Sequence, residues 1–310
     1  MLLPLYPDAE TRAKILADPQ TAPIPDLHKE MFRFCERFVR ASWEMTPDDL
    51  QRLRDAGLTE AQVVLWATLG STQSWFTMSA DGGGIPMERD AMTGPGVGKA
   101  RADYEASPEG LLAPATAARV GVTAPASDSV AWVGTDETLP LHKAAADEAR
   151  ERYGFVPNLL RALSLQPTFH PRHLLALELL ERPQSQTLTP RLHALIRARV
   201  SHLTRSAYGA VTTRALLERV TGDVELWDRL GADTAPPEAD PVERVVLDFA
   251  TKVARNAYKV TEKDAIAFRE CGLGDEGYVD ALNTTSIQVA MDRLANALGV
   301  QPDEEPTLPA

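Results

Sequence analysis

The chain has 310 residues, and 44% of them are hydrophobic, which is enough for about two globular domains. Its formal net charge of -12 argues against nucleic acid or an anionic membrane as a main partner, because both attract basic faces. Two cysteines, Cys35 and Cys271, are too few for a disulfide framework, and no apolar stretch reaches the roughly 18 residues of a membrane span. We therefore expect a cytoplasmic protein that binds neither nucleic acid nor membrane.

The first part of the chain is predicted to be helical. Residues 34–85 read as a helix, a short helix, a glycine stop and a long helix. Thr46 is a typical helix N-cap residue and Asp49 follows three positions later, while Gly57 stands where a left-handed helix C-terminus favours glycine. The next stretch, 87–140, is rich in Gly, Pro and Ala, which predicts a linker or a lid.

Helical periodicity returns at Leu141 and continues over 171–181, 189–217 and 223–230. No stretch of the sequence has the alternation that is typical of a strand. Near the C-terminus, Thr261 and Gly272 repeat the cap and stop signals of Thr46 and Gly57. The sequence therefore predicts an all-α protein.

An internal repeat links the two ends of the chain. At an offset of 215, residues 34–85 align with residues 249–300 without a gap and share 12 identities in 52 positions, where chance would give about three. We predict a partial helical unit at 1–86, a linker or lid at 87–140 and a complete helical domain at 141–310. Repeated units of this kind usually pack on each other.

Several motifs resemble the alkylhydroperoxidase D and carboxymuconolactone decarboxylase family, in its peroxidase-related branch. Tyr153-Gly154-Phe155-Val156-Pro157-Asn158-Leu159-Leu160 with Gln166-Pro167 is similar to the family's entry motif, and residues 188–223 are similar to its core helix pair. Residues 249–282 and 292–300 resemble its last helices. The resemblance covers roughly 150–300 and implies an alkylhydroperoxidase D-like helical domain, of which residues 34–85 repeat the last third.

The same resemblance implies that the family's redox site has been lost. Peroxidase members carry a glutamate, a Cys-x-Tyr-Cys motif and a histidine, which together lower the pKa of a thiol. These positions fall on Ala194, Ser206, Gly209 and Thr213 here, and only Tyr208 is kept. We therefore expect no dithiol peroxidase chemistry by the family mechanism.

Polar residues on the same two helices are the candidates for a replacement site. His202 can transfer a proton near neutral pH, and the hydroxyls of Ser206, Tyr208 and Thr213 can bind a carbonyl or carboxylate. The bland interpretation is that the histidine is a structural helix residue and that the hydroxyls cap or pack helix ends. We take these four as candidate catalytic residues.

Four further residues are candidates for substrate binding. Arg197 and Arg293 can hold an anionic group, Gln288 occupies the repeated middle of the last long helix, and Trp75 can line an apolar pocket. Each also has a structural interpretation, which for Arg293 is an ion pair with Asp292. His170 and His173 lack the companions of a metal site, so we predict no metal and no cofactor.

Three functions remain open on the sequence. We favour an enzyme that acts without cofactor or thiol, by acid–base chemistry on a small organic metabolite, in a decarboxylation, isomerisation, elimination or cyclisation. The first alternative is a catalytically dead family member that binds or assembles, and the second is a residual peroxidase that uses Cys35 or Cys271. The resemblance also implies a homo-oligomer. The excess of arginine over lysine and the abundant alanine suggest a bacterial protein from a GC-rich genome.

Overall fold

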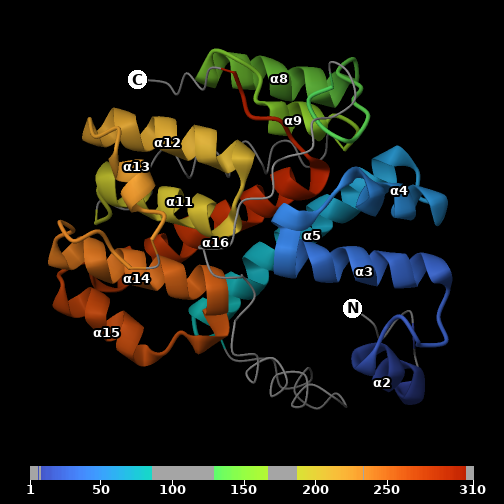
Figure 1. Cartoon of the computed structure of the whole chain (residues 1–310), viewed down its shortest axis with the longest axis horizontal. Helices are drawn as coiled ribbons and strands as arrows, with labels where there is room; N and C mark the ends of the chain where they lie inside the picture. Colours follow the sequence, from blue (N-terminus) through green and yellow to red (C-terminus); the bar gives the residue numbers. More distant parts are fainter. Residues whose placement is uncertain (1–5, 7, 86–128, 167–186, 233, 305–310) are drawn as a thin grey trace.

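The computed structural model describes residues 6, 8–85, 129–166, 187–232 and 234–304, and every regular element within these ranges is a helix (Figure 1). Most of the predicted linker, 87–128, and the predicted helix at 171–181 lie outside the described residues. The helices of the N-terminal part are α2 (Ala9–Ala17), α3 (Asp26–Ala41), η1 (Ser42–Glu44), α4 (Pro47–Asp55) and α5 (Glu60–Gly82). Then follow α8 (Pro140–Tyr153), α9 (Asn158–Ala162), α11 (Pro190–Thr204), α12 (Ala207–Thr221), α13 (Leu226–Arg229), α14 (Pro241–Asn256), η3 (Ala257–Lys259), α15 (Glu262–Glu270) and α16 (Gly274–Leu298).

The cap and stop signals of the sequence act as predicted. Thr46 forms a capping box with Asp49 at the start of α4, and Thr261 forms the same box at the start of α15. Gly57 and Gly272 have φ angles of 108° and 90°, which a residue with a side chain rarely adopts. These four positions fix where each short helix begins and ends.

The repeat-aligned segments have the same order of elements. The bounds of α3, η1 and α4 differ by 215 residues from those of α14, η3 and α15, and this is the offset at which the two sequences align. The long helices α5 and α16 follow in the corresponding places. Both segments therefore share one local design, a helix that turns through a 3-10 turn into a short helix and then into a long one.

The long helices α5 and α16 cross the middle of the molecule and make its most extensive helix contact (Figure 1). The hydroxyl of Ser71 donates to the Ala290 carbonyl at 2.8 Å, and the Ser79 and Ser286 hydroxyls lie 3.0 Å apart. Residue numbers increase along α5 from Ser71 to Ser79, while those of their partners on α16 decrease from Ala290 to Ser286. The two helices therefore run antiparallel. Small side chains at these points let the two backbones approach.

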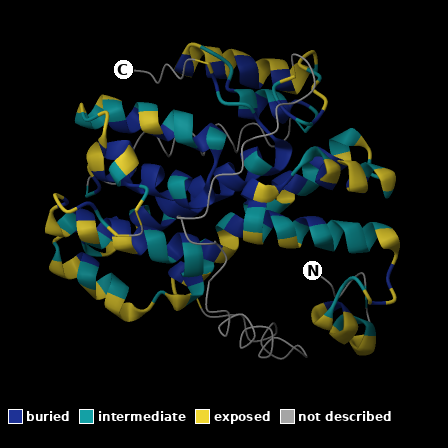
Figure 2. Ribbon diagram, in the orientation of Figure 1, coloured by how far each residue is buried: buried dark blue, intermediate teal, exposed yellow. Residues whose placement is uncertain are grey.

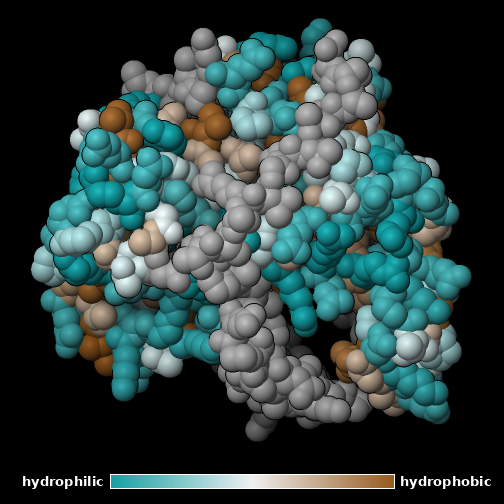
Figure 3. Space-filling view, in the orientation of Figure 1, coloured by the Kyte–Doolittle hydropathy of each residue, from teal (hydrophilic) through white to brown (hydrophobic). Residues whose placement is uncertain are grey.

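Helices α11 and α12 pack on one side of α16, and α14 and α15 also pack against it. α11 and α16 are dark blue along most of their length in Figure 2, since almost every residue of α11 from Leu192 to Thr204 is buried. On the face shown in Figure 3, the described surface is mostly hydrophilic and its apolar residues form small separate patches. Among the described residues, no helix has both the length and the apolarity to span a membrane.

Candidate functional site

The turn between α11 and α12 is the place where the redox motif would lie. Arg205 ends α11 with a φ of 53°, which makes it the one non-glycine residue with a positive φ in the described chain. Ser206 then caps α12, because its buried hydroxyl oxygen accepts the Gly209 N–H at 3.0 Å. A serine at the first cysteine position therefore works as a helix cap.

Gly209, at the second cysteine position, packs directly on Asp292 of α16. A Cβ atom built on Gly209 would lie 2.0 Å from the Asp292 Oδ1 atom and 2.8 Å from the Ser201 hydroxyl oxygen. No side chain fits there while Asp292 keeps its position, because such a contact is far inside the van der Waals limit. The carboxylate of Asp292 thus takes up the space that a side chain at position 209 would need.

The Asp292 carboxylate is fully buried and accepts hydrogen bonds from two helices. Its Oδ2 atom accepts from the hydroxyls of Ser201, at 2.9 Å, and Thr204, at 2.7 Å, both on α11. Its Oδ1 atom accepts from the amide of Gln288, one turn earlier on α16, at 2.9 Å. The Gln288 carbonyl oxygen accepts in turn from the Arg197 Nε–H at 3.0 Å. We call these five residues the Asp292 network.

The network leaves Asp292 with an unusual proton affinity. Burial raises the pKa of its carboxyl to about 6, and the bonds from Thr204, Ser201 and Gln288, with the nearby Arg197 charge, oppose the rise only in part. Near neutral pH such a group exchanges a proton readily, as a carboxyl with its ordinary pKa does not. Arg197 is also almost completely buried, so a cation lies near this carboxylate inside the protein.

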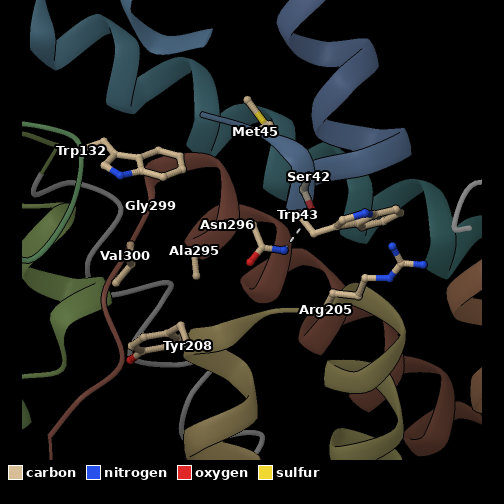
Figure 4. A pocket seen from close by; sticks show the side chains of 10 residues that line it. All are labelled: Ser42, Trp43, Met45, Trp132, Arg205, Tyr208, Ala295, Asn296, Gly299 and Val300. Carbon is tan, nitrogen blue, oxygen red and sulfur yellow. Dashed lines mark hydrogen bonds between the residues drawn. The ribbon is translucent and has the colours of Figure 1, made fainter. Parts of the chain in front are cut away.

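A small cavity lies beside the network, between the N-terminal segment and the core helix pair (Figure 4). Its volume is about 20 Å³, which is room for one water molecule. Its walls are Ser42, Trp43, Met45, Trp132, Arg205, Tyr208, Ala295, Asn296, Gly299 and Val300. The side chain of Arg205 runs along the Trp43 indole, with its guanidinium carbon 4.5 Å from the ring centre (Figure 4).

Asn296 connects this cavity to the Asp292 network. Its side-chain amide donates to the Thr204 carbonyl at 3.0 Å and to the Ser42 hydroxyl at 3.2 Å, and Figure 4 shows the second of these bonds. Thr204 itself donates through its hydroxyl to Asp292. Thr204 therefore contacts the cavity wall through its backbone carbonyl and the buried carboxylate through its side-chain hydroxyl.

Tyr208 is the one residue of the redox motif that this chain keeps, and it lines the same cavity. Burial raises the pKa of its hydroxyl well above the usual value, and the neighbouring Asp303 carboxylate adds to the rise. The hydroxyl therefore stays protonated at physiological pH and acts as a hydrogen-bond donor. Burial also raises the pKa of Asp303, whose Oδ1 atom accepts the backbone N–H of Asn158 at 2.7 Å.

The remaining candidate catalytic residues lie in structural positions. The His202 ring stacks on Trp227 with ring centres 4.1 Å apart, and its Nε2 atom is 2.7 Å from the Trp227 carbonyl oxygen, so it joins α11 to α13. Thr213 donates back along α12 to the Gly209 carbonyl at 2.8 Å. Of the four candidates, the structure places Ser206 and Tyr208 at the turn, Thr213 further along α12 and His202 against α13.

Two of the four candidate binding residues belong to the Asp292 network, and the other two lie elsewhere. Arg197 and Gln288 belong to the Asp292 network. Arg293 is buried on another side of α16, where its Nη1 atom donates to the Ser74 hydroxyl of α5 at 3.2 Å. Trp75 stacks on Phe76 with ring centres 5.1 Å apart, on α5.

The last candidates to place are the two cysteines, Cys35 and Cys271, and the two histidines, His170 and His173. Burial raises the pKa of Cys35 to about 11, so almost none of this thiol is the reactive thiolate at neutral pH. The Cys271 thiol lies 3.5 Å from the Phe268 carbonyl oxygen as a weak donor. His170 and His173 lie outside the described residues, and within the described ranges no three His, Cys, Asp or Glu side chains converge as metal ligands.

No protein-family model and no curated protein matches this sequence. Solved structures do match it. An uncharacterized peroxidase-related protein from Silicibacter sp. has 25% sequence identity and a TM-score of 0.52, over 60% of this chain and 98% of that one. The chain has the all-α fold of the alkylhydroperoxidase D-like proteins. A second uncharacterized peroxidase-related protein, from Ralstonia eutropha and described as an alkylhydroperoxidase core, has 25% identity and a TM-score of 0.48, over 54% of this chain and 87% of that one.

For an alkylhydroperoxidase D-like protein, the resemblance noted above places the redox motif at the start of α12. This chain has a capping serine and a tightly packed glycine there, and Asp292 lies beside them. In the sequence, Asp292 stands out only as a partner of Arg293. A usable signal was present in the four-residue spacing of Gln288 and Asp292, which puts two polar side chains on one face of a helix that is otherwise suited to burial.

Proposed function

We propose that this chain is an alkylhydroperoxidase D-like enzyme that performs cofactor-free, non-thiol acid–base chemistry on a small organic metabolite, with Asp292 as its proton-transferring group. The observation that supports this most is the contact between the Asp292 carboxylate and Gly209, because it puts a buried, readily protonated group at the second cysteine position. A carboxyl with a pKa of about 6 is mostly ionised at pH 7, where it can take a proton from substrate and return it.

The proposed division of roles follows the hydrogen bonds. Asp292 accepts the proton once the wall movement proposed below opens a path to it, and the hydroxyls of Ser201 and Thr204 stay on its Oδ2 atom and stabilise the ionised carboxylate. Tyr208, whose hydroxyl is hydrogen-bonded to Asp303, would turn its hydroxyl hydrogen to a substrate oxygen at the cavity wall when substrate binds. Arg197 offsets the negative charge of the ionised carboxylate, through Gln288 and through space. Decarboxylation, isomerisation, elimination and cyclisation can each be catalysed by such a proton transfer.

The cavity in its present form has room for only one water molecule, so substrate binding requires a wall to move. Trp132 is the half-buried wall residue that comes from outside the helices, in the segment before α8, and its ring lies against Gly299. We propose that its displacement opens the site, as loop motions do in many enzymes. The enlarged cavity would then extend from Tyr208 towards Asp292, which packs on the neighbouring Gly209.

The test begins by incubating the purified chain with an extract of small metabolites and following the loss and gain of masses. For any conversion found, Asp292→Asn should lower the turnover rate by about 10²–10⁴-fold, because the amide keeps the size of the side chain and cannot accept the proton. The rate should be measured at several pH values, since the wild-type rate should rise as pH passes through about 6 and Asp292 ionises.

Asp280→Asn is the matched control. Asp280 is also on α16 and also bonds to a polar residue of α11, since its Oδ2 atom is 3.1 Å from His193 Nε2. It lies three turns from Asp292, so its neutralisation should leave turnover unchanged. An extract in which the wild-type chain converts nothing, or a conversion that survives Asp292→Asn, would contradict the proposal and favour the binding or assembly alternative.

A further inference from the structure

One line of polar residues along α16 contacts α11. Asp280 and Thr284 contact His193, Gln288 contacts Arg197, and Asp292 and Asn296 contact Thr204. These positions on α16 are four residues apart, so they form a single line along the helix. In this half of the molecule, α11 covers the line from end to end.

The corresponding line on α5 faces outwards. At the offset of 215 it consists of Leu65, Leu69, Gln73, Thr77 and Asp81. Leu69 is 43% exposed and Phe76, beside the same line, is 57% exposed, although both are large apolar residues. Gln73, Thr77 and Asp81 are exposed too. No described helix runs along this face of α5 in the way that α11 runs along α16.

The charge of the molecule limits which partners can bind to this face of α5. The chain carries a net charge of -12, so two copies repel each other over most of their surfaces. Residues 61–80 of α5 contain no charged side chain, and the charged Glu60 and Asp81 lie just beyond the two ends of this stretch. A second copy of the chain can therefore approach here without like-charge repulsion, and a burial of apolar side chains would stabilise the contact.

The face is also complementary to itself. If a second α5 is laid antiparallel, with the twofold axis between Thr72 and Gln73, Leu69 of each copy lies opposite Phe76 of the other. Leu65 then faces Ala80, and the two Gln73 amides meet near the axis, where each can donate to and accept from its mate. A symmetric dimer requires such self-pairing, because the same patch serves both subunits.

We propose that the outer face of α5 is a dimer interface, in which α5 packs antiparallel on α5 of a second copy of this chain through Leu65, Leu69 and Phe76. The proposal is independent of the chemistry proposed for Asp292. It predicts that the full chain in solution contains this twofold contact.

Sedimentation velocity of the full chain tests the interface. The wild-type protein should sediment as at least twice the 33.8 kDa chain mass at micromolar concentration. Leu69→Glu and Phe76→Glu should each weaken this association by about tenfold or more, because each buries an unpaired charge. Both residues are exposed in the single chain, so the fold should be kept, and circular dichroism checks this. Val279→Glu, at a 51% exposed valine of α16, is the matched control and should not change the association.

A crosslink tests the register. Gln73→Cys lies next to the proposed axis and should form a disulfide-linked dimer in mild oxidant, in which peptide mass spectrometry identifies a bond between the two thiols introduced at position 73. Asp81→Cys would lie about 25 Å from its mate along the paired helices and should not crosslink. A monomeric wild-type chain, an association that is insensitive to Phe76→Glu, or a crosslink at position 81 in place of position 73 would each overturn the proposal.

Discussion

Replacing Gly209 with alanine should lower the free energy of unfolding by about 3 kcal/mol, because the new methyl group would lie 2.0 Å from the Asp292 Oδ1 atom and displace a buried carboxylate. Chemical denaturation followed by circular dichroism measures this loss. Gly70→Ala is the control, since it also lies within a helix and its Cβ would meet Phe38 at an ordinary 3.5 Å. Alanine is a better helix former than glycine by about 1 kcal/mol, so the control should be neutral or stabilising.

A double-mutant cycle separates this clash from a general intolerance of α12. Asp292→Ala alone should be destabilising, since it leaves the donors of Ser201, Thr204 and Gln288 without their acceptor. In combination with Gly209→Ala the two losses should be less than additive, because the smaller side chain at position 292 makes room for the methyl group. Additive losses would show that the two positions do not compete for one space.

Replacing Gly299 with alanine should also cost about 3 kcal/mol, because two effects add. Gly299 ends α16 with a φ of 62°, which costs a residue with a side chain about 1 kcal/mol. Its new Cβ would also lie 2.0 Å from the Trp132 ring and push this wall of the cavity away. Thermal unfolding measures the loss, and the tryptophan emission should shift to longer wavelength as Trp132 becomes exposed.

Gly222→Ala is the control for backbone strain. Gly222 ends α12 with a φ of 69°, and a Cβ there would meet nothing within 4 Å, so only the strain should appear. If Gly299→Ala lowers the free energy of unfolding no more than Gly222→Ala does, the Trp132 ring does not pack against Gly299 in solution. In a Trp132→Ala background, Gly299→Ala should cost about as much as Gly222→Ala costs in the wild type.

Local signals in the sequence were sufficient to predict where the helices begin and end. The candidate site could be found only from the tertiary structure. Thr46, Thr261, Gly57 and Gly272 act within a few residues of themselves, so their type and spacing predict the bounds of α4 and α15. The contact of Gly209 with Asp292 joins positions 83 residues apart, 292 minus 209, and it depends on how α12 crosses α16. No periodicity along one helix contains this information.

His202 illustrates the same limit. Helical spacing put it at the edge of the face that carries Ser201 and Arg205, and a histidine there suits acid–base chemistry. The short helix α13 covers this edge, where the imidazole stacks on the Trp227 ring and contacts the Trp227 carbonyl oxygen. Which polar residue at a helix edge meets a cavity, and which meets a neighbouring helix, is decided by elements that lie far away in the sequence. The homo-oligomer likewise stays a prediction, now with a proposed surface on α5.

The glycine at position 209 and the position of Asp292 have one common physical explanation. A cysteine at position 209 and a carboxylate at 292 compete for the same buried volume, so glycine at 209 is what allows the carboxylate to lie between α11, α12 and α16. Burial of an ionisable group normally costs stability, and it is retained most often where a perturbed pKa is used. The proposed acid–base function gives such a use.

The most direct test of the Asp292 site is an NMR titration of the aspartate carboxyl carbons in the wild-type chain and in Asp292→Asn. Burial raises the pKa of Asp292 from 3.8 to about 6, so its ionisation opposes folding, and stability should fall as pH rises through this range in the wild type and not in the variant. We predict one resonance that titrates near pH 6 and is missing from the variant. If the missing resonance instead titrates at the ordinary aspartate pKa of about 4, Asp292 is no proton-transferring group at neutral pH and the proposed acid–base role is wrong.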